Sequence, residues 1–414
     1  VLYSLFLGGQ LSLSKVKRKM KTLPVIFMAL ASGIGYSQEG PKDLNALIDL
    51  ALQNNQNLQA AELKVKEAEA LTSSAFDFDK TSVYYGYDQN NRAINNEPIS
   101  VFGVQQNLRF PTAYFSKSKL MRRDAALQRS AYQLEEMKVK KAISSAYYSY
   151  LTAREKQTIY ELLRDVYSLF AKASERRFEL GETNHLERIT ARSKSTQVSL
   201  RAEQSILASQ NAYSGLMALI QAEDSLVISE LAPVRLALNG DAIPGSPELQ
   251  LMQDQYSVAE QQVRLERQQL LPDISLEYFQ GSNTNLDDNL YGYQVGLKFP
   301  ILFNKQASRI KASSIALDQT DAFIRDRQIR LQTKYKELMN QYKRYSQALD
   351  YYDAEGKELA EELLKTTEAY FKNGEIDFFQ YIQSIENAYG LKLDHLEQLD
   401  RYNQTVIALN YLTF

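Results

Sequence analysis

The chain has 414 residues, of which 44% are hydrophobic and 24% charged, and its formal net charge is −2. A near-neutral chain lacks the basic surface that binds nucleic acid, so we expect no nucleic-acid partner. The absence of cysteine excludes disulfides and thiolate metal sites, and two histidines, His185 and His395, argue against an ordinary zinc or copper site. We therefore predict no metal, no other cofactor and no catalytic site.

The first residues have the pattern of a membrane-targeting region. A basic block, 15–21, precedes a short apolar stretch, 23–31, and the small residues before Gln38 resemble a signal-peptidase site. Residues 1–9 resemble the end of the last membrane helix of heavy-metal pumps of the resistance-nodulation-division family. We predict that residues 1–37 are a pump-like extension with a signal peptide or membrane segment. A fusion to an upstream pump and an extension of the reading frame that is never made both stay open.

Residues 38–232 are predicted to contain a helix, two strands and a long helical hairpin. From Thr112 to Leu180 there is no Gly or Pro, and apolar residues recur at three and four positions. A continuous helix of this length would be roughly 100 Å long, which indicates coiled-coil-like packing along a rod. The other predicted elements are a helix at 43–74, strands at about 81–88 and 99–110, and a returning helix at 184–231.

Residues 247–414 repeat this order after a linker at 233–246. Three anchors recur at offsets of 191, 189 and 193 residues: Leu58 with Leu249, Leu108 with Leu297, and Phe178 with Phe371. A period this long is not that of a solenoid, so the chain holds two similar structural units. The second unit is predicted to have helices at 247–270, 301–373 and 377–412 and strands at about 273–281 and 290–299.

The strands alternate between apolar and polar residues and are rich in aromatic residues. Strands of about ten residues with this alternation are typical of a transmembrane β-barrel, although an ordinary two-sided antiparallel sheet would alternate in the same way. In the barrel interpretation Gln105 and Gln294 face the lumen. The residues predicted to face lipid are Phe102, Val104, Tyr291, Tyr293 and Val295.

Four strands cannot close a barrel alone. Unpaired backbone groups in hydrocarbon cost several kcal/mol each, so closure demands more than one chain. Three chains would supply twelve strands, which leaves room for a channel. The predicted fold class is therefore mainly α with a small β portion, whose sheet is closed by further copies of the chain.

Both repeats have paired Leu-Arg/Lys-Phe-Pro strand exits and Phe-x-x-Gly-Glu turns, and the second also has Pro300-Ile-Leu-Phe303. In these motifs the chain resembles the TolC-type outer-membrane efflux proteins, over roughly residues 42–413. The resemblance implies a homotrimer with a twelve-stranded outer-membrane barrel continued by a periplasmic helical barrel, with Pro111 and Pro300 at the transition. Residues 374–383 and 402–406 look closest to members that serve heavy-metal pumps. The implied partners are a periplasmic adaptor, an inner-membrane pump of that family and outer-membrane lipid.

In this family such Gly-Glu turns lie at the periplasmic tip. Gly181 and Gly374 would end the outgoing helices, and Glu182 and Glu375 would form a ring of six carboxylates that favours cations. The alternative is helix capping, in which these acidic residues interact with a helix N-terminus. An aspartate pair of the family's type member corresponds to Gln380 and Gln383 here, which puts a strong anionic constriction in doubt. Glu187, at the equivalent position of the first repeat, keeps one charge.

Two other classes of protein are weighed against an export duct. A periplasmic adaptor has long helical hairpins but usually one hairpin between β-rich halves, and a coiled-coil scaffold would not need two aromatic-rich strand pairs. An enzyme is not expected, because the sequence shows no glycine-rich phosphate loop and no Ser/His/Asp arrangement. We therefore predict a passive duct for metal cations or small toxic compounds, in the outer membrane with a long periplasmic extension. The exported substrate stays open, because a duct takes its specificity from its pump.

Overall fold

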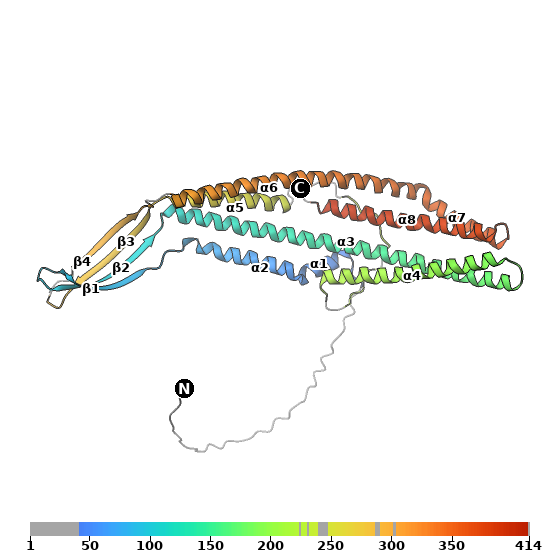
Figure 1. The fold of residues 1–414 in the computed structure, drawn as a ribbon, viewed down its shortest axis with the longest axis horizontal. Helices are drawn as coiled ribbons and strands as arrows, with labels where there is room; N and C mark the ends of the chain where they lie inside the picture. Colours follow the sequence, from blue (N-terminus) through green and yellow to red (C-terminus); the bar gives the residue numbers. More distant parts are fainter. Residues whose placement is uncertain are drawn as a thin grey trace, which may run out of the picture. The chain divides into compact units, whose positions relative to one another are not determined.

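The structure is a computed structural model that describes residues 41–222, 225–229, 232–238, 247–285, 290–300 and 304–412. The described residues belong to one compact unit, Pro41–Phe414. The predicted extension and signal segment at 1–37 lies outside the described residues, as do residues 239–246 of the predicted linker. Within this unit the sheet lies at one end of the long helices and both hairpin turns lie at the other (Figure 1).

Two short helices open the first repeat, α1 (Leu44–Asn54) and α2 (Gln56–Leu71), followed by a 3₁₀ turn, η1 (Thr72–Phe76). The sequence predicts a single helix here, but Asn55 divides it. The backbone of Asn55 is extended, and its side chain accepts a hydrogen bond of 2.9 Å from the Leu58 amide. Asn55 thus ends α1 and caps α2, as expected of an asparagine at an N-cap position.

Both repeats contribute one hairpin to a four-stranded antiparallel sheet of order β1-β2-β3-β4. The first hairpin is β1 (Ser82–Arg92) with β2 (Pro98–Leu108), and the second is β3 (Asp273–Ser282) with β4 (Leu290–Lys298). The two hairpins join along β2 and β3, in a register that places Val104 opposite Tyr278. Residues 174 positions apart in the sequence, Val104 and Tyr278, therefore pair in one continuous ladder.

The first long hairpin consists of α3 (Pro111–Glu179) and α4 (His185–Ile220). α3 runs for 69 residues without a break, as the lack of Gly and Pro predicts. α4 is shorter than predicted, because Gln221 adopts a left-handed backbone with φ 54° and ends the helix. Part of the predicted helix beyond it, residues 225–229, is extended instead and forms a parallel bridge between Ile228 and Lys42.

The second repeat begins with α5 (Pro247–Gln268), and its long hairpin has a break in the outgoing arm. This arm consists of α6 (Asn304–Tyr351), a π-helical turn η2 (Tyr352–Gly356) and α7 (Lys357–Lys372). The returning helix is α8 (Phe378–Asn410). π-helical turns are rare and cluster at functional sites and kinks.

Buried apolar clusters hold the helices together at three levels along the unit. One cluster joins α1, α3 and α4, a second near the hairpin turns joins α3, α4 and α8, and a third joins α6 and α8. The fully buried Asn403 of α8 fixes the linker: it accepts a hydrogen bond from the Leu236 amide and donates one to the Val234 carbonyl. Asn403 therefore satisfies one backbone donor and one backbone acceptor of the linker without regular structure.

Candidate channel and tip sites

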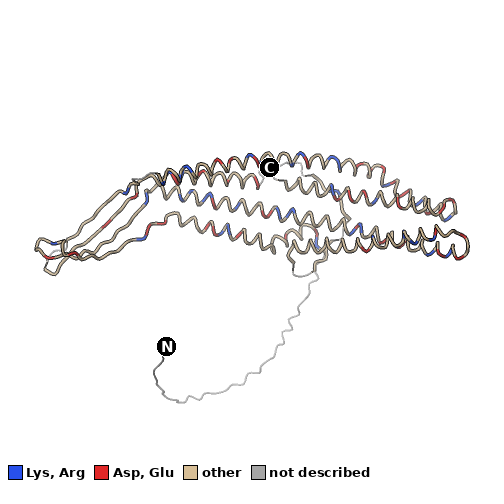
Figure 2. Tube along the Cα trace, viewed as in Figure 1, with Lys and Arg blue, Asp and Glu red and all other residues tan. Residues whose placement is uncertain are grey.

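One face of the sheet is apolar and exposed. The five residues predicted to face lipid all lie on it: Gln280 joins Phe102 to Tyr291, and Tyr278 joins Val104 to Tyr293. Tyr293 is 80% exposed and Val295 66%. Across the ladder rows from Ser100 to Leu108, this face has no charged residue among the described strands, and Figure 2 shows the strands almost free of charge. An apolar face of this size on a sheet requires a covering or an apolar solvent.

The opposite face is polar and contains one central carboxylate, Glu277. Glu277 lies beside Gln105 and Gln294 in the same ladder row, and it accepts a hydrogen bond from the Tyr84 hydroxyl two strands away. The two lumen-facing glutamines predicted from the sequence therefore share a face and a row. Sequence reasoning missed Glu277 as a site residue, although it falls on the polar positions of the alternation.

The exit from the sheet into the helices has an aromatic cluster beside Pro111. Pro111 begins α3, where its missing N–H costs nothing. The Tyr114 ring lies 6.2 Å from Phe76 and 5.3 Å from Phe78, between ring centroids. Pro300 follows β4 at the equivalent exit of the second repeat. Tyrosine and other aromatics collect where a barrel meets the membrane interface, so this cluster is expected at such a boundary.

Both hairpin turns have the same backbone geometry. Gly181 and Gly374 have φ of 73° and 74°. In the first turn the Glu182 amide donates to the Arg177 carbonyl, and in the second the Glu375 amide donates to the Tyr370 carbonyl, both at 2.8 Å. This six-to-one hydrogen bond after a left-handed glycine defines a Schellman motif, so the two repeats end their outgoing helices identically.

The returning helices are capped by residues other than the two glutamates. The side chain of Asn184 accepts from the Glu187 amide at the start of α4, and that of Asp377 accepts from the Gln380 amide at the start of α8, both at 2.9 Å. Glu182 and Glu375 precede these caps by two residues and are exposed. Neighbouring side chains therefore supply the N-cap hydrogen bonds, and both glutamates are exposed at the turns. Their interaction with the helix macrodipole stays the alternative to a place in the permeation path.

The remaining predicted tip residues are engaged in local contacts. The Glu187 carboxylate is only 13% exposed, accepts a hydrogen bond from Thr183 and pairs with Arg177 at 3.1 Å. Gln380 completes a capping box, since its side chain accepts from the Asp377 amide. Gln383 is exposed and donates to Asn387, one helical turn away. The charge expected at Glu187 is therefore compensated by a neighbouring guanidinium.

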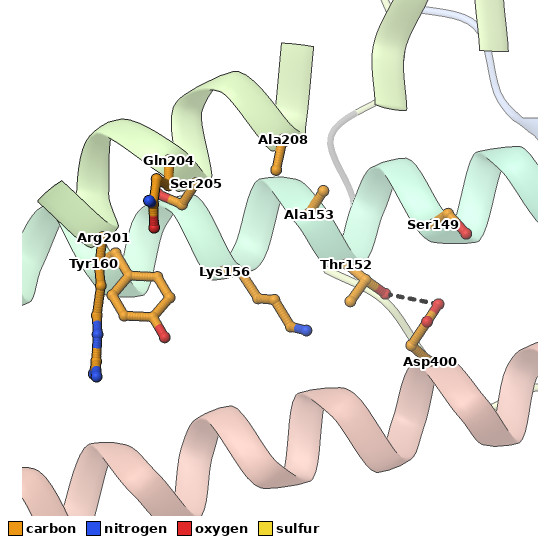
Figure 3. Close-up of a pocket in the computed structure, with 10 residues that line it drawn as sticks. All are labelled: Ser149, Thr152, Ala153, Lys156, Tyr160, Arg201, Gln204, Ser205, Ala208 and Asp400. Atoms are coloured by element: carbon orange, nitrogen blue, oxygen red, sulfur yellow. Dashed lines mark hydrogen bonds between the residues drawn. The ribbon is translucent and has the colours of Figure 1, made fainter. Parts of the chain in front are cut away.

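A groove of about 530 Å³ lies between α3, α4 and α8 (Figure 3). Lys156 and Arg201 line it, and among the described residues neither has a hydrogen-bond or ion-pair partner. Asp400 lies across from them and accepts from Thr152 at 3.4 Å. Burial raises the pKa of the Asp400 carboxyl, and its hydrogen bonds and the Lys156 charge oppose this shift. Sequence reasoning missed this groove, because it joins residues from three distant segments.

The π-helical turn has a histidine packed against it. The Tyr352 ring stacks on His395 of α8, with centroids 3.8 Å apart, and the His395 Nδ1 atom is buried without a hydrogen-bond partner. Burial lowers the pKa of His395, and the Asp353 carboxylate opposes this shift. His395 is therefore a packing residue, whereas His185 lies exposed beside the first turn.

Comparison with known proteins gives a family match for the second repeat. Residues 238–413 match the family model described as outer membrane efflux protein, which is a family of ducts rather than of enzymes. No curated protein sequence matches the chain. No helix among the described residues is both long and apolar enough to span a bilayer.

Solved structures with similar folds cover nearly the whole chain. A membrane protein from Pseudomonas aeruginosa has a TM-score of 0.73 at 15% identity, over 89% of this chain and 92% of that one. CusC, whose structure is described in terms of folding and transmembrane channel formation, has a TM-score of 0.69 at 16% identity, over 91% of this chain and 94% of that one. The CmeC outer membrane channel of Campylobacter jejuni has a TM-score of 0.68 at 14% identity, over 89% of this chain and 86% of that one. The predicted fold class, mainly α with a small β portion built from duplicated units, is confirmed.

Proposed function

We propose that this chain, whose second repeat and fold are those of TolC-type outer-membrane efflux proteins, is the exit duct of a tripartite efflux system. The observation that carries this proposal is the sheet. It has an exposed apolar face, a polar opposite face, and two edge strands, β1 and β4, that no described strand covers. Such a sheet is complete only in a closed barrel.

A homotrimer provides the closure. Three copies supply twelve strands, an even number within the range of outer-membrane barrels, and each β4 edge then pairs with the β1 edge of a neighbouring copy. The long helices of three copies continue the barrel into the periplasm as a helical tunnel. Phe102, Val104, Tyr291, Tyr293 and Val295 face lipid in this assembly, and Pro111 and Pro300 mark the passage from barrel to tunnel.

The Gly-Glu turns form the periplasmic end of the duct. Glu182 and Glu375 are exposed, and other residues cap the adjacent helices, so six carboxylates in the trimer are available to the permeation path. A periplasmic adaptor and an inner-membrane pump of the resistance-nodulation-division family are the proposed partners at this end. Metal cations or small toxic compounds are the proposed substrates, and the metal assignment rests on residues 374–383 and 402–406.

Charge reversal at the tip tests the position of the turns. With both Glu182→Lys and Glu375→Lys, six carboxylates per trimer become six ammonium groups and the local potential changes sign. We expect reconstituted channels to shift from cation toward anion preference. The folded trimer should lose little stability, because dipole effects at exposed helix ends are worth only about 0.3–1 kcal/mol. The measurement is the reversal potential of single channels in a salt gradient.

Glu187→Gln is the matched control, since this carboxylate is already paired with Arg177. It should leave the reversal potential nearly unchanged. An unshifted potential in the double Lys variant would remove Glu182 and Glu375 from the permeation path. Failure of the purified protein to form channels at all would instead contradict the duct.

Mass spectrometry of the mature N-terminus tests the fate of residues 1–37. A start at Gln38 means a separate, cleaved protein, and peptides across 15–42 support a fusion.

A further inference from the structure

A single charge stands in the middle of the polar face of the sheet. Between the ladder rows of Val101 and Asn107, Glu277 is the one charged residue among the described strand residues of this face. Asp88 marks one end of the face, and Asp273, paired in the ladder with Lys298, marks the other. Lys298 donates to Asn107 rather than to a carboxylate. Glu277 has no ion-pair partner among the described residues, so none of them forms an ion pair that compensates its negative charge.

The surroundings of Glu277 are arranged to hold it. Gly103 of β2 lies between Tyr84 of β1 and the neighbouring strand β3. A Cβ atom on Gly103 would lie 2.2 Å from the Tyr84 ring, so only glycine lets this ring lie flat across β2. The flat ring brings the Tyr84 hydroxyl to the Glu277 carboxylate, to which it donates a hydrogen bond. The carboxylate is therefore positioned by three strands.

The same packing repeats one strand further along. Phe279 of β3 covers Gly292 of β4, where an added Cβ would lie 2.5 Å from the ring. Both rings thus lie along the sheet rather than standing away from it. Beside them, Glu277 has only Gln105 and Gln294 as lateral neighbours in its row. On the polar face, the flat rings of Tyr84 and Phe279 therefore lie beside a row of polar side chains that has the Glu277 carboxylate at its centre.

An ionised carboxylate at mid-strand cannot face hydrocarbon. The opposite face of the sheet has no charged residue in the same stretch and is the face suited to lipid. In a closed barrel the Glu277 face is therefore the lumen. Strand rows recur in each copy, so three chains place three Glu277 carboxylates at one height of the pore.

We propose that Glu277 forms a second charge filter, a ring of three carboxylates inside the outer-membrane barrel that favours the passage of cations. This inference rests on the proposed trimeric duct, and it names the class of solute that the barrel itself favours. The ring is separate from the glutamates of the periplasmic turns, which lie at the other end of the long helices (Figure 1). Its effect on permeation is greatest at low salt, where the Debye length reaches roughly 30 Å at 0.01 M.

The absence of native cysteine allows a direct test. Glu277→Cys channels in planar bilayers are treated with anionic, cationic or neutral methanethiosulfonate reagents, and labelling is verified by mass. We expect unlabelled and neutrally labelled channels to lose cation preference relative to the parent. The anionic reagent should restore the preference, and the cationic reagent should shift the reversal potential toward that of anions.

Two matched variants in β4 serve as controls. Gln294→Cys lies in the same row on the same face, so anionic labelling there should increase cation preference. Val295→Cys lies on the apolar face, so charged, membrane-impermeant reagents should leave it unlabelled in bilayers. Labelled Glu277→Cys channels whose reversal potential does not depend on the charge of the reagent would overturn the proposal, as would failure to label this position in conducting channels. A protein that forms no channels would instead contradict the duct itself.

Discussion

The two repeats are alike at their ends and differ in the middle. Both return their hairpins through the same Schellman motif at Gly181 and Gly374, and both contribute one hairpin to the sheet. However, α3 runs unbroken for 69 residues, whereas the second outgoing arm has a π-helical turn at residues 352–356. Duplication has therefore kept the geometry that joins elements and let the interior of one long helix diverge. The features shared by both repeats are those that the sheet and the tip require.

The π-helical turn is flanked by contacts with the linker and with α8. Arg235 of the linker pairs with Asp350 at 2.7 Å, and its guanidinium lies 4.9 Å from the centroid of the Tyr402 ring. Tyr352, at the start of the turn, stacks on His395. The linker that follows the first repeat thus contacts the second outgoing helix immediately before its break. The π-helical turn is itself one of the known causes of helix kinks.

The sheet should give the largest effects, and equally in both repeats. In the proposed barrel, arginine at Val295 in the second repeat or at Val104 in the first places a charge on the lipid face, which costs roughly 2–4 kcal/mol at the bilayer midplane. We expect both variants to lose most of their membrane-inserted trimer. Arginine at the adjacent Gln294 or Gln105 should be tolerated, because the proposed barrel places these residues in its lumen. The readout is the trimer fraction in outer-membrane extracts.

Equal losses for the neighbouring positions, or a greater loss at Gln294 than at Val295, would show that the two faces are assigned the wrong way round. A loss at Val295 without one at Val104 would break the symmetry between the repeats. The first outcome concerns the orientation of the sheet, and the second concerns the equivalence of its hairpins.

Alanine at Gly356 should affect only the second hairpin. Its Cβ would lie 2.9 Å from Cδ2 of Tyr352, so the stack on His395 must shift. We expect the free energy of unfolding to fall by about 1–3 kcal/mol, the usual cost of overpacking. Gly390 of α8 is the matched control, because nothing lies within 4 Å of its added Cβ. Alanine there should stabilise the helix by about 0.5–1 kcal/mol. Thermal unfolding of the purified protein compares the two variants, and equal shifts would mean that the π-helical turn is not specifically supported.

Much of this organisation was predictable because it follows short sequence periods. Alternation of period two placed Phe102 and Val295 on one face of the sheet, as observed, and the absence of Gly and Pro predicted the length of α3. The bond between Tyr84 and Glu277 was not predictable, because it depends on the register of three strands and on the space above Gly103. A sequence period relates residues within one strand or helix, whereas these contacts join residues of several strands.

The predicted helix through residue 231 is wrong beyond Gln221, although no Gly or Pro marks the place. Its continuation instead packs against other segments, as Ile228 does beside Lys42. Here tertiary contacts overrode the local pattern. The ion pair of Glu187 with Arg177 was not predictable for a related reason, because Arg177 lies on the preceding helix, across the turn.

The smallest effect should come from acidification, through His395. Burial lowers the pKa of His395, so the unfolded chain binds a proton more readily than the folded chain. The contribution of neutral His395 to the free energy of unfolding is therefore complete above the ordinary histidine pKa of about 6.5. It is lost as the pH decreases toward the lower pKa of the folded state. Unfolding midpoints between pH 7.5 and 5 should decline more in the parent than in His395→Gln. Parallel declines in the two proteins would show that protonation of His395 does not contribute.

In the proposed assembly, other copies of the chain complete this sheet. Native mass spectrometry of the protein extracted from outer membranes in mild detergent measures how many copies do so. We expect a particle with the mass of three chains, because three four-stranded sheets close a twelve-stranded barrel and leave no open edge. A stable membrane-inserted monomer, or a particle with another number of chains, would contradict it.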